Sequence, residues 1–479
     1  PSFIYINTAR SHSTLTHTHT HTHTHTAMAS SPSLLPLGLL LLLILVPFAL
    51  AAPSHCATPP DQRSTINIFR ASDPCSPFRP SVRSSSWEDT MMNFMTYDES
   101  RLTYLASLAT SHRPSGRSFV PIAPGRQLLQ IPNYVVRASL GTPAQPMLVA
   151  LDTSSDAAWF PCTACTGCAS TSTSASFDPS SSTTYRPLPC GSPQCAQVPN
   201  PSCPEGAASC AFNLTYGGSS VQAGLAQDIL ALASEVVQSY TFGCVQKMTG
   251  NSIPPQGLLG LGRGPLSFLS QTKDLYASTF SYCLPSFKSL NFSGTLRLGP
   301  IGQPTKIKTT TLLSNARRSS LYYVSMIGIR VGRRVLDIPP SAFAFDPATG
   351  AGTIIDSGTM FTRLVAPAYA ALRDEFRRRV KAAGPVTSLG GFDTCYNGAI
   401  KPPAITLMFM GMNVTLPPDN ALIHSTAGSI TCLAMAAAPD NVNSVLNVIA
   451  NVQQQNHRVF FDVPNARVGF AREFCTAAA

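Results

Sequence analysis

Charged residues are scarce in this chain of 479 residues: Lys, Arg, Asp and Glu together make up 12%, whereas hydrophobic residues make up 44%. A chain of this composition can bury large cores, and its length exceeds that of one ordinary domain. We therefore expect two domains together with segments that are removed. Gly, Pro, Ser and Thr recur between short apolar runs in the second half, which favours strands and turns over helix bundles. The sequence predicts an all-β fold.

Histidine is nearly missing after residue 127, where only His424 and His457 occur. A Ser-His-Asp or Cys-His site would need one of them, and neither lies in a nucleophile-elbow context. A phosphate-binding loop is missing too, because Gly260, Gly262 and Gly264 are not followed by Lys and Ser or Thr. We expect no metal and no cofactor.

Long apolar runs are missing except for one near the start of the chain. Residues 34–50 form this run, which is interrupted by Pro36 and Pro47 and ends in Ala49-Leu50-Ala51, the pattern that a signal peptidase reads. We predict a signal peptide at residues 28–51 and a secreted protein with no stable membrane anchor. A transmembrane anchor is the alternative, since the run nears membrane-spanning length if the prolines are ignored.

Methionine is missing from residues 1–27, which contain an alternating His/Thr tract from His17 to Thr26. A repeat of C and A nucleotides would encode such a tract, so we interpret residues 1–27 as an upstream untranslated region that has been read through. A metal-binding His-rich segment is the alternative. We exclude these residues from the fold.

Cysteine, in contrast, is plentiful: twelve of the fourteen cysteines lie after residue 127, an even number that suits disulfides in an oxidising compartment. The cluster Cys162, Cys165 and Cys168 has the spacing of a zinc knuckle, but the scarcity of histidine favours disulfides. A secretory route would also allow glycosylation at three sequons, Asn213, Asn291 and Asn413.

The segment 52–126 has the layout of a prosegment. Residues 52–83 are rich in Pro, Ser and Arg, so we expect irregular structure there, and residues 113–126 form a basic linker. Between them, residues 87–108 have apolar side chains at helical spacing, namely Met91, Phe94, Met95, Leu102 and Leu105. We predict a zymogen; an N-terminal decoration that is never removed is the alternative.

One short motif occurs twice. Leu148–Leu151 leads into Asp152-Thr153-Ser154, and Gly352–Ile355 leads into Asp356-Ser357-Gly358-Thr359. Each copy is an apolar strand that ends in Asp, a hydroxyl residue and a small residue. The two aspartates are 204 residues apart (356 minus 152), about one lobe of chain.

A second echo follows each copy, Gly-Leu-Leu-Gly-Leu-Gly at 257–262 and Leu-Asn-Val-Ile-Ala-Asn at 446–451. Two copies of one motif pair predict two similar lobes that face each other. We place the N-terminal lobe at residues 127–310 and the C-terminal lobe at residues 311–479.

Two facing carboxylates, Asp152 and Asp356, suit acid–base chemistry. Brought within hydrogen-bond distance they share one proton, so one can take a proton from water while the other protonates a scissile carbonyl oxygen. Thr153 and Ser357 can hydrogen-bond across the lobe junction, and Gly358 lets backbone amides approach the carboxylates. An Asp that caps a turn is the common reading of any single copy, but its recurrence in matched contexts favours a catalytic pair.

These motifs resemble the pepsin-like aspartic proteases, most closely the plant nepenthesin-like or atypical group, over about residues 130–475. The matching segments are Tyr134–Pro143, Asp152–Asp156 with Trp159, the Cys-rich insert, and residues 257–271, 350–359, 366–380 and 448–470. The resemblance implies two β-rich lobes around a substrate cleft that a hairpin flap closes. It also implies a secreted, monomeric endopeptidase of the apoplast or cell wall that acts on proteins or peptides.

The resemblance assigns roles to individual residues. Asp152 and Asp356 are then the catalytic pair, and Tyr216 is the flap tyrosine with Trp159 packed behind it; ordinary core packing is the alternative for Trp159. The supporting residues are Thr153, Ser155, Ser357, Gly358 and Thr359. The implied disulfides are Cys395 with Cys432 and Cys244 with Cys475.

Three departures from the family pattern bear on activity. Ser154 stands where the family usually has Gly, and Ala450 replaces the Gly of the second echo. The flap reads Gly217-Gly218-Ser219 where an acidic residue is common. The Ser154 side chain could crowd the pair or shift its pKa values.

Two rival functions are weighed against an enzyme. Plant xylanase-inhibitor proteins share the fold as silent binding proteins, but loss of a catalytic Asp would support that function and both are kept. Nucleic-acid binding is raised by the net charge of +7 from Gln127 onward (24 Lys plus Arg minus 17 Asp plus Glu) and by the run Arg377–Lys381. We expect a solvated helix face there and no nucleic-acid partner, with acidic cell-wall polysaccharide as a candidate partner instead.

Overall fold

The computed structural model describes residues 65–70, 87–109, 133–168, 176–203, 208–216, 218–232, 235–250, 257–286, 294–381, 384–425, 429–439 and 445–475. The predicted read-through segment, the signal peptide, the basic linker at residues 113–126 and the sequon Asn291 lie outside these residues. Of residues 52–83 only 65–70 are described, and they form a strand, so the expectation of irregular structure is wrong there. No helix within the described part is long and apolar enough to cross a membrane.

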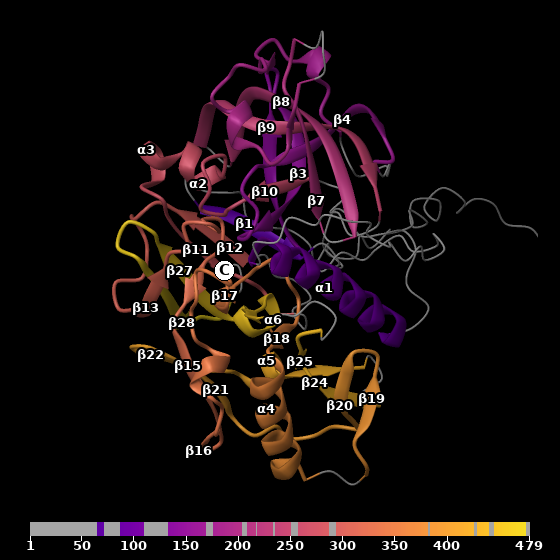
Figure 1. Cartoon of the computed structure of the whole chain (residues 1–479), viewed down its shortest axis with the longest axis vertical. Helices are drawn as coiled ribbons and strands as arrows, with labels where there is room; N and C mark the ends of the chain where they lie inside the picture. The colour runs from indigo at the N-terminus through magenta and orange to yellow at the C-terminus, as the bar shows by residue number, and fades with distance from the viewer. Residues whose placement is uncertain are drawn as a thin grey trace, which may run out of the picture. The chain divides into compact units, whose positions relative to one another are not determined.

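Strands dominate the described chain, which confirms the predicted all-β fold (Figure 1). The first half contains β1 (Thr65–Arg70), α1 (Trp87–Ala109), β2 (Tyr134–Leu140), β3 (Gln145–Asp152), β4 (Trp159–Thr166), β5 (Arg186–Pro187), β6 (Pro201–Ser202), β7 (Ala211–Tyr216), β8 (Ser219–Leu232), β9 (Glu235–Thr249), β10 (Leu258–Gly260), α2 (Phe268–Gln271), α3 (Lys273–Tyr276), β11 (Thr279–Cys283) and β12 (Gly294–Leu298).

The second half has a similar succession of short elements. It contains β13 (Lys308–Leu313), β14 (Tyr323–Val324), β15 (Met326–Val331), β16 (Arg334–Val335), β17 (Gly352–Ile355), β18 (Thr362–Leu364), α4 (Ala366–Arg379), β19 (Thr387–Leu389), β20 (Phe392–Asn397), β21 (Ile405–Phe409), β22 (Met412–Thr415), α5 (Pro418–Ala421), β23 (Leu422–His424), β24 (Ile430–Leu433), β25 (Met435–Ala437), β26 (Leu446–Ile449), α6 (Asn451–Gln454), β27 (His457–Asp462) and β28 (Arg467–Arg472).

The hairpin β8–β9 shows why these residues form strands. Along β8, Val221, Ala223 and Leu225 are buried, whereas the alternating neighbours Ser220 and Gln222 are exposed. Successive side chains of a strand point to opposite faces, so this alternation buries one face and leaves the other to solvent.

The duplicated motif forms the same substructure twice. β3 ends at Asp152 and runs parallel to β10, with Gly260 opposite Asp152. β17 leads to Asp356 and runs parallel to β26, with Ile449 opposite Ile355. The two echoes in the sequence are therefore the parallel neighbours of the two strands that carry the aspartates.

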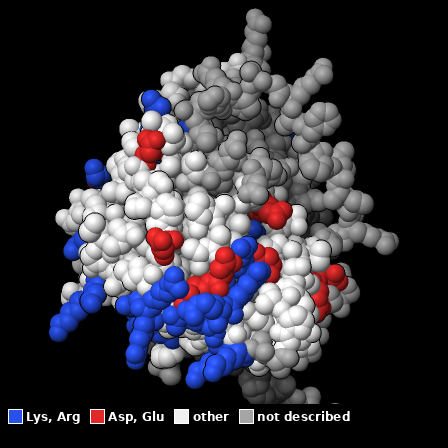
Figure 2. Space-filling view, turned by 60° about the horizontal axis from the view of Figure 1, so that its bottom comes forward, with Lys and Arg blue, Asp and Glu red and all other residues white. Residues whose placement is uncertain are grey.

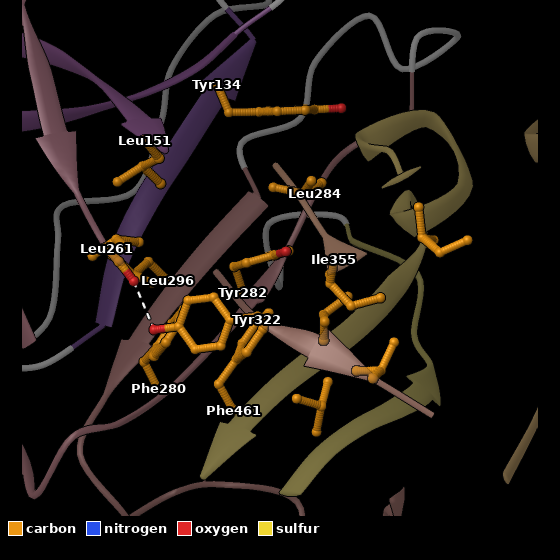
Figure 3. Close-up of a cluster of buried hydrophobic side chains, with 14 of the residues drawn as sticks. Tyr134, Leu151, Leu261, Phe280, Tyr282, Leu284, Leu296, Tyr322, Ile355 and Phe461 are labelled. Atoms are coloured by element: carbon orange, nitrogen blue, oxygen red, sulfur yellow. Dashed lines mark hydrogen bonds between the residues drawn. The ribbon is translucent and has the colours of Figure 1, made fainter. Parts of the chain in front are cut away.

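An aromatic core joins the two halves of the chain (Figure 3). β11 from the first half pairs with β27 from the second, and Phe280 stacks on Phe461 with their ring centroids 4.5 Å apart. Tyr322 packs edge-on against Phe461 and donates a hydrogen bond of 2.7 Å to the carbonyl oxygen of Leu261. Such close packing has few voids, so it holds the strand ends from both halves at a defined separation.

Helix α1 lies where the apolar spacing predicted a helix. The residues that predicted it are all buried: Met91, Phe94, Met95, Leu102 and Leu105. The first three belong to a buried cluster with Phe361 and Phe392, and the last two to a cluster with Tyr323 and Ile354. α1 is thus packed on strands of the second half, and the preceding β1 pairs antiparallel with β2 and β12.

Six disulfides link the described cysteines, none of which is free. They are Cys162–Cys244, Cys165–Cys168, Cys190–Cys203, Cys195–Cys210, Cys283–Cys475 and Cys395–Cys432. The pairing of Cys395 with Cys432 agrees with the resemblance, but the pairing of Cys244 with Cys475 is wrong. β4 and β9 are parallel neighbours, which brings Cys244 beside Cys162. The strand order β11–β27–β28 brings Cys475 to Cys283 instead.

Candidate active site

The two aspartates of the duplicated motif lie together at the ends of β3 and β17. Both are fully buried. The turns that follow them are tied by a reciprocal pair of hydrogen bonds: the amide of Thr153 donates to Ser357 Oγ at 3.2 Å, and the amide of Ser357 donates to Thr153 Oγ1 at 3.0 Å. These bonds join residues 204 positions apart, so they hold the two carboxylates in register across the lobe junction.

Three groups of its own lobe hold the Asp152 carboxylate. Ser155 Oγ donates to Oδ2 at 2.8 Å, and the Ser154 amide donates to Oδ1 at 2.9 Å. The Tyr216 hydroxyl, at the end of β7, also donates to Oδ2 at 3.0 Å. Donors to both oxygens prevent the carboxylate from rotating.

Asp356 has a matching set. Thr359 Oγ1 donates to its Oδ2, and the Gly358 amide donates to its Oδ1 at 3.2 Å. A Cβ at residue 358 would lie 3.0 Å from Asp152 Oδ1, closer than nearly all real contacts of this kind. Gly358 is therefore the residue that lets the second loop approach the first carboxylate.

Ser154 occupies the corresponding place in the first loop, two residues after its aspartate. Its Oγ lies 3.0 Å from Oδ1 of Asp152 and 2.8 Å from Oδ1 of Asp356. A hydroxyl has one proton, so it donates to one carboxylate at a time. The side chain that departs from the family pattern thus bridges the facing oxygens of the pair.

Tyr216, the expected flap tyrosine, and Trp159, expected behind it, lie near the pair. Tyr216 and Trp159 are both buried and belong to one hydrophobic cluster. Because β7 and β8 form a hairpin that pairs Tyr216 with Ser219, the tyrosine stands at the hairpin's turn. Its hydroxyl reaches Asp152, as described above, while its ring faces the Arg101 guanidinium 4.7 Å away.

Arg101 of α1 enters this site from outside both lobes. Its Nη2 lies 2.6 Å from Oδ1 of Asp152 and 3.3 Å from Oδ1 of Asp356, and it also donates to Ser154 Oγ. All these side chains are buried. A guanidinium therefore occupies the position between the facing carboxylate oxygens.

Two neighbours of Arg101 on α1 also contact the site. The Tyr97 hydroxyl lies 3.3 Å from the Tyr216 hydroxyl. The Asp98 carboxylate accepts hydrogen bonds from the amides of Met360 and Phe361, at 2.7 and 2.6 Å. Three residues of α1 thus contact three parts of the site: Tyr97 contacts Tyr216, Arg101 contacts the two aspartates, and Asp98 contacts the loop that follows Asp356.

Sequence reasoning missed these α1 residues although a signal was present. Tyr97, Asp98 and Arg101 are spaced so that they share a helix face with the buried Leu102 and Leu105. Polar residues within an apolar helical stripe require partners, because buried charges are almost always paired. The pattern indicated a helix but did not identify its partners.

The surroundings shift the pKa of several groups. Burial alone would raise the pKa of Asp356, but the Arg101 guanidinium and the hydroxyls of Thr359 and Ser154 hold it below its usual value. Burial raises the pKa of Tyr216 far above that of a free tyrosine, so its hydroxyl stays protonated as a donor. In this arrangement Asp356 is held ionised.

The glycines at 260, 262 and 264 have a packing role. A Cβ at Gly260 would lie 2.1 Å from the backbone oxygen of Asp156, and one at Gly264 would lie 2.1 Å from the Asp156 carboxylate. The Gly264 amide donates to that carboxylate at 2.8 Å. These glycines therefore let β10 and its following loop lie against the first aspartate loop. In the other half, Ala450 is fully buried and its amide donates to Thr362 Oγ1 at 3.0 Å.

The other predicted residues lie away from the pair. The sequons Asn213 on β7 and Asn413 on β22 are exposed. The basic run at the end of α4 makes ion pairs with Glu375 and Asp393 and does not contact the aspartates.

Two family models match most of the chain. One is described as xylanase inhibitor N-terminal and covers residues 134–300; the other is described as xylanase inhibitor C-terminal and covers residues 321–472. The structure is similar to the crystal structure of edgp, with a TM-score of 0.59 at 19% identity, over 72% of this chain and 92% of that one. It is also similar to basic 7S globulin from soybean, with a TM-score of 0.58 at 21% identity, over 72% and 95%. These two likenesses show the fold.

Curated relatives share much more of the sequence. Aspartyl protease AED3 of Arabidopsis thaliana is 50% identical over 435 residues, which cover 89% of this chain and 96% of that protein. Aspartyl protease 25 of Oryza sativa subsp. japonica is 50% identical over 398 residues, covering 79% and 89%. Aspartic proteinase nepenthesin-1 of Nepenthes gracilis is 35% identical over 355 residues, covering 72% and 78%. The bilobal fold and these relatives together confirm the resemblance, and the chain belongs to the plant group of the pepsin-like aspartic protease family.

Proposed function

We propose that this chain is the precursor of a secreted aspartic endopeptidase that cleaves peptide bonds with a water activated between Asp152 and Asp356. One observation carries the proposal: two buried carboxylates from matched strand ends face each other closely enough for Ser154 Oγ to reach both, at 3.0 and 2.8 Å. Two carboxylates at this separation cannot both ionise cheaply once no cation lies between them, so they share a proton.

The shared proton supplies the acid and the base of the reaction. The ionised carboxylate takes a proton from a water bound between the facing oxygens, and the water oxygen attacks the scissile carbonyl carbon. The protonated carboxyl gives its proton to the carbonyl oxygen, and the tetrahedral intermediate then loses the amine. Ser155 and Thr359 hold the outer oxygens, so the inner ones stay directed at the water. The Thr153–Ser357 bonds maintain the separation on which the coupling depends.

The position of α1 supports a zymogen with its prosegment at residues 52–126. Arg101 lies where the reaction needs a water, and its guanidinium contacts one oxygen of each carboxylate. In this state the pair can bind neither that water nor a peptide. The active enzyme would then consist of the two lobes, residues 127–310 and 311–479, after removal of the signal peptide at 28–51 and of the prosegment.

The decisive experiment compares the processed protein with its Asp152→Asn variant in cleavage of a denatured protein at acidic pH. We expect kcat to fall by at least a thousandfold in the variant, because an amide cannot act as the general base. A statine-type transition-state mimic should block the wild-type activity.

A matched control is Asp274→Asn, which changes an exposed aspartate on α3 and should leave the activity unchanged. The rival function is a silent binding protein, like the inhibitors after which the two matching family models are named. Equal cleavage by the wild type and the Asp152 variant, or no cleavage by either after proven removal of α1, would decide for that rival.

A second proposal concerns the surface around α4, which we call the α4 arginine surface and define as Arg334, Arg373, Arg377, Arg378 and Arg379. Figure 2 shows Lys and Arg gathered around a few acidic side chains where the lower end of Figure 1 comes forward. The carboxylate of Glu375 accepts contacts from three of these arginines, at 2.5 to 3.5 Å, and Asp393 from the other two. Five guanidiniums share few carboxylates, so donors remain for another anion. We propose that acidic cell-wall polysaccharide binds here.

A further inference from the structure

The loop after Asp356 offers two backbone amides that point at one place. In the precursor the Asp98 carboxylate fills that place, with one oxygen 2.7 Å from the Met360 amide nitrogen and the other 2.6 Å from that of Phe361. Asp98 and both loop residues are fully buried. Adjacent amides that converge on a carboxylate form an anion-binding site from main-chain atoms alone.

A buried cation stands beside this site. Arg363, two residues further on in β18, is 2% exposed. Burial raises the pKa of Asp98 and lowers the pKa of Arg363, and the opposite charge of each group acts against the other's shift. Its Nη1 donates to the Ala437 carbonyl oxygen at 3.3 Å, and its Nη2 lies 3.4 Å from Met95 Sδ. Its Nε has no hydrogen-bond partner among the described residues.

Both groups that cover Arg363 on the α1 side belong to the helix that the proposed function removes. Once Met95 and Asp98 leave, Arg363 keeps one carbonyl acceptor from its own lobe and loses its countercharge. Once uncovered, a guanidinium beside two backbone amides that converge on one place favours an anion there. The vacated place is therefore complementary to a carboxylate.

We infer that Met360, Phe361 and Arg363 form a substrate subsite for an acidic side chain, and that Asp98 occupies it in the precursor as a stand-in for a substrate Asp or Glu. The inference rests on the proposed function, since it requires α1 to leave. The subsite belongs to the C-terminal lobe, because Met360 follows directly after the loop Asp356–Thr359. Arg363 is a specificity-determining residue in this view and takes no part in proton transfer.

The test uses the processed full protein and octapeptide substrates in which Glu or Gln stands in turn at each position around one scissile bond. We expect one position where Glu raises kcat/KM about tenfold over Gln, the scale of a hydrogen-bonded charge pair. In Arg363→Gln the ratio at that position should fall to about one, and Arg363→Lys should retain part of it.

The Gln peptides are cleaved without the subsite, so their kcat/KM shows that each variant is folded and active. Arg186→Gln, an exposed arginine on β5, serves as the charge-matched control and should keep the full preference. Equal rates for Glu and Gln at every position of an active enzyme overturn the inference and leave the proposed function intact. A preference that survives in Arg363→Gln overturns the role of Arg363. No cleavage of any peptide overturns both the function and the subsite.

Discussion

Ser154 is the residue on which the strength of the proposed activity depends. Its Oγ contacts the facing oxygens of both aspartates and helps to lower the pKa of Asp356. The equivalent residue of the other loop is Gly358, which has no side chain to place there. The hydroxyl therefore competes with the catalytic water for the same two acceptors.

We predict that Ser154→Gly raises kcat of the processed enzyme roughly fivefold, because releasing one hydrogen bond of about 1 kcal/mol frees both acceptors. It should also move the acidic limb of the pH profile upward, since the pKa of Asp356 loses a lowering contact. The measurement is kcat and kcat/KM against pH.

The Ser154→Ala variant distinguishes the effect of the hydroxyl on activity from the effect of the Cβ atom. If Ala behaves like Gly, the hydroxyl is responsible; if Ala behaves like Ser, the Cβ crowds the site. An unchanged profile and kcat in both variants would show that the contact has no catalytic consequence.

At the scale of elements, helix α1 places Arg101 between the aspartates, and two of its contacts respond to pH in opposite senses. Arg101 holds the pKa of Asp356 below its usual value, so this contribution to docking exists at higher pH and is lost as the pH falls through the lowered pKa. Burial raises the pKa of Asp98 to about 7, although Arg363 and the two amides lower it. Docking through Asp98 is therefore strengthened as the pH falls from about 7 towards its ordinary pKa of about 4.

We predict that α1 of the precursor is docked most firmly in mildly acidic solution and leaves at strongly acidic pH. Trp87 and Trp159 are the only tryptophans of the chain. In a Trp87→Phe precursor, Trp159 reports on the loss of Tyr97, which shares its buried cluster. Its emission should shift to the red only below about pH 4, where the carboxylates protonate.

Arg101→Gln supplies the control for this response. Breaking a buried ion pair from one side costs about 3 kcal/mol or more, so docking should weaken most at neutral pH, where the carboxylate pair keeps a negative charge that no cation of α1 compensates. The unprocessed variant should then cleave peptides, and the acid-induced shift should shrink. A shift of the same size at the same pH in Arg101→Gln would contradict the assigned role of Arg101.

At the scale of the whole molecule, the basic character that composition predicts is concentrated partly on the α4 arginine surface. We predict that the protein binds to de-esterified pectin with a salt-dependent retention, and that Arg378→Gln combined with Arg379→Gln lowers the salt concentration needed for elution by at least a third. The measurement is the salt concentration at which each protein elutes from immobilised pectin and from immobilised DNA in a salt gradient.

The matched control is Lys273→Gln combined with Arg297→Gln, which removes the same charge from other elements. If both double variants elute alike, net charge and not the α4 arginine surface governs retention. Tighter retention on DNA than on pectin would favour the nucleic-acid partner that the sequence argued against.

The β-rich class, the helix at α1 and the repetition of the aspartate motif could be foreseen, because each depends on a local pattern of apolar and small residues. The disulfide of Cys244 could not, since its partner depends on β4 lying beside β9, a contact between segments 82 residues apart. The same holds for Arg101, whose helix was predicted but whose partners lie 51 and 255 residues away.

The sequence alone thus determined the two aspartates, their matched loops and the all-β class, because a repeated motif carries its chemistry in neighbouring residues. Only the tertiary structure decided that Ser154 bridges the pair, that Arg101 lies between the carboxylates and that Asp98 fills the amide site beside Arg363. The reason is physical: local patterns fix which face of an element is buried, whereas the partner of a buried polar group is fixed by the packing of distant elements.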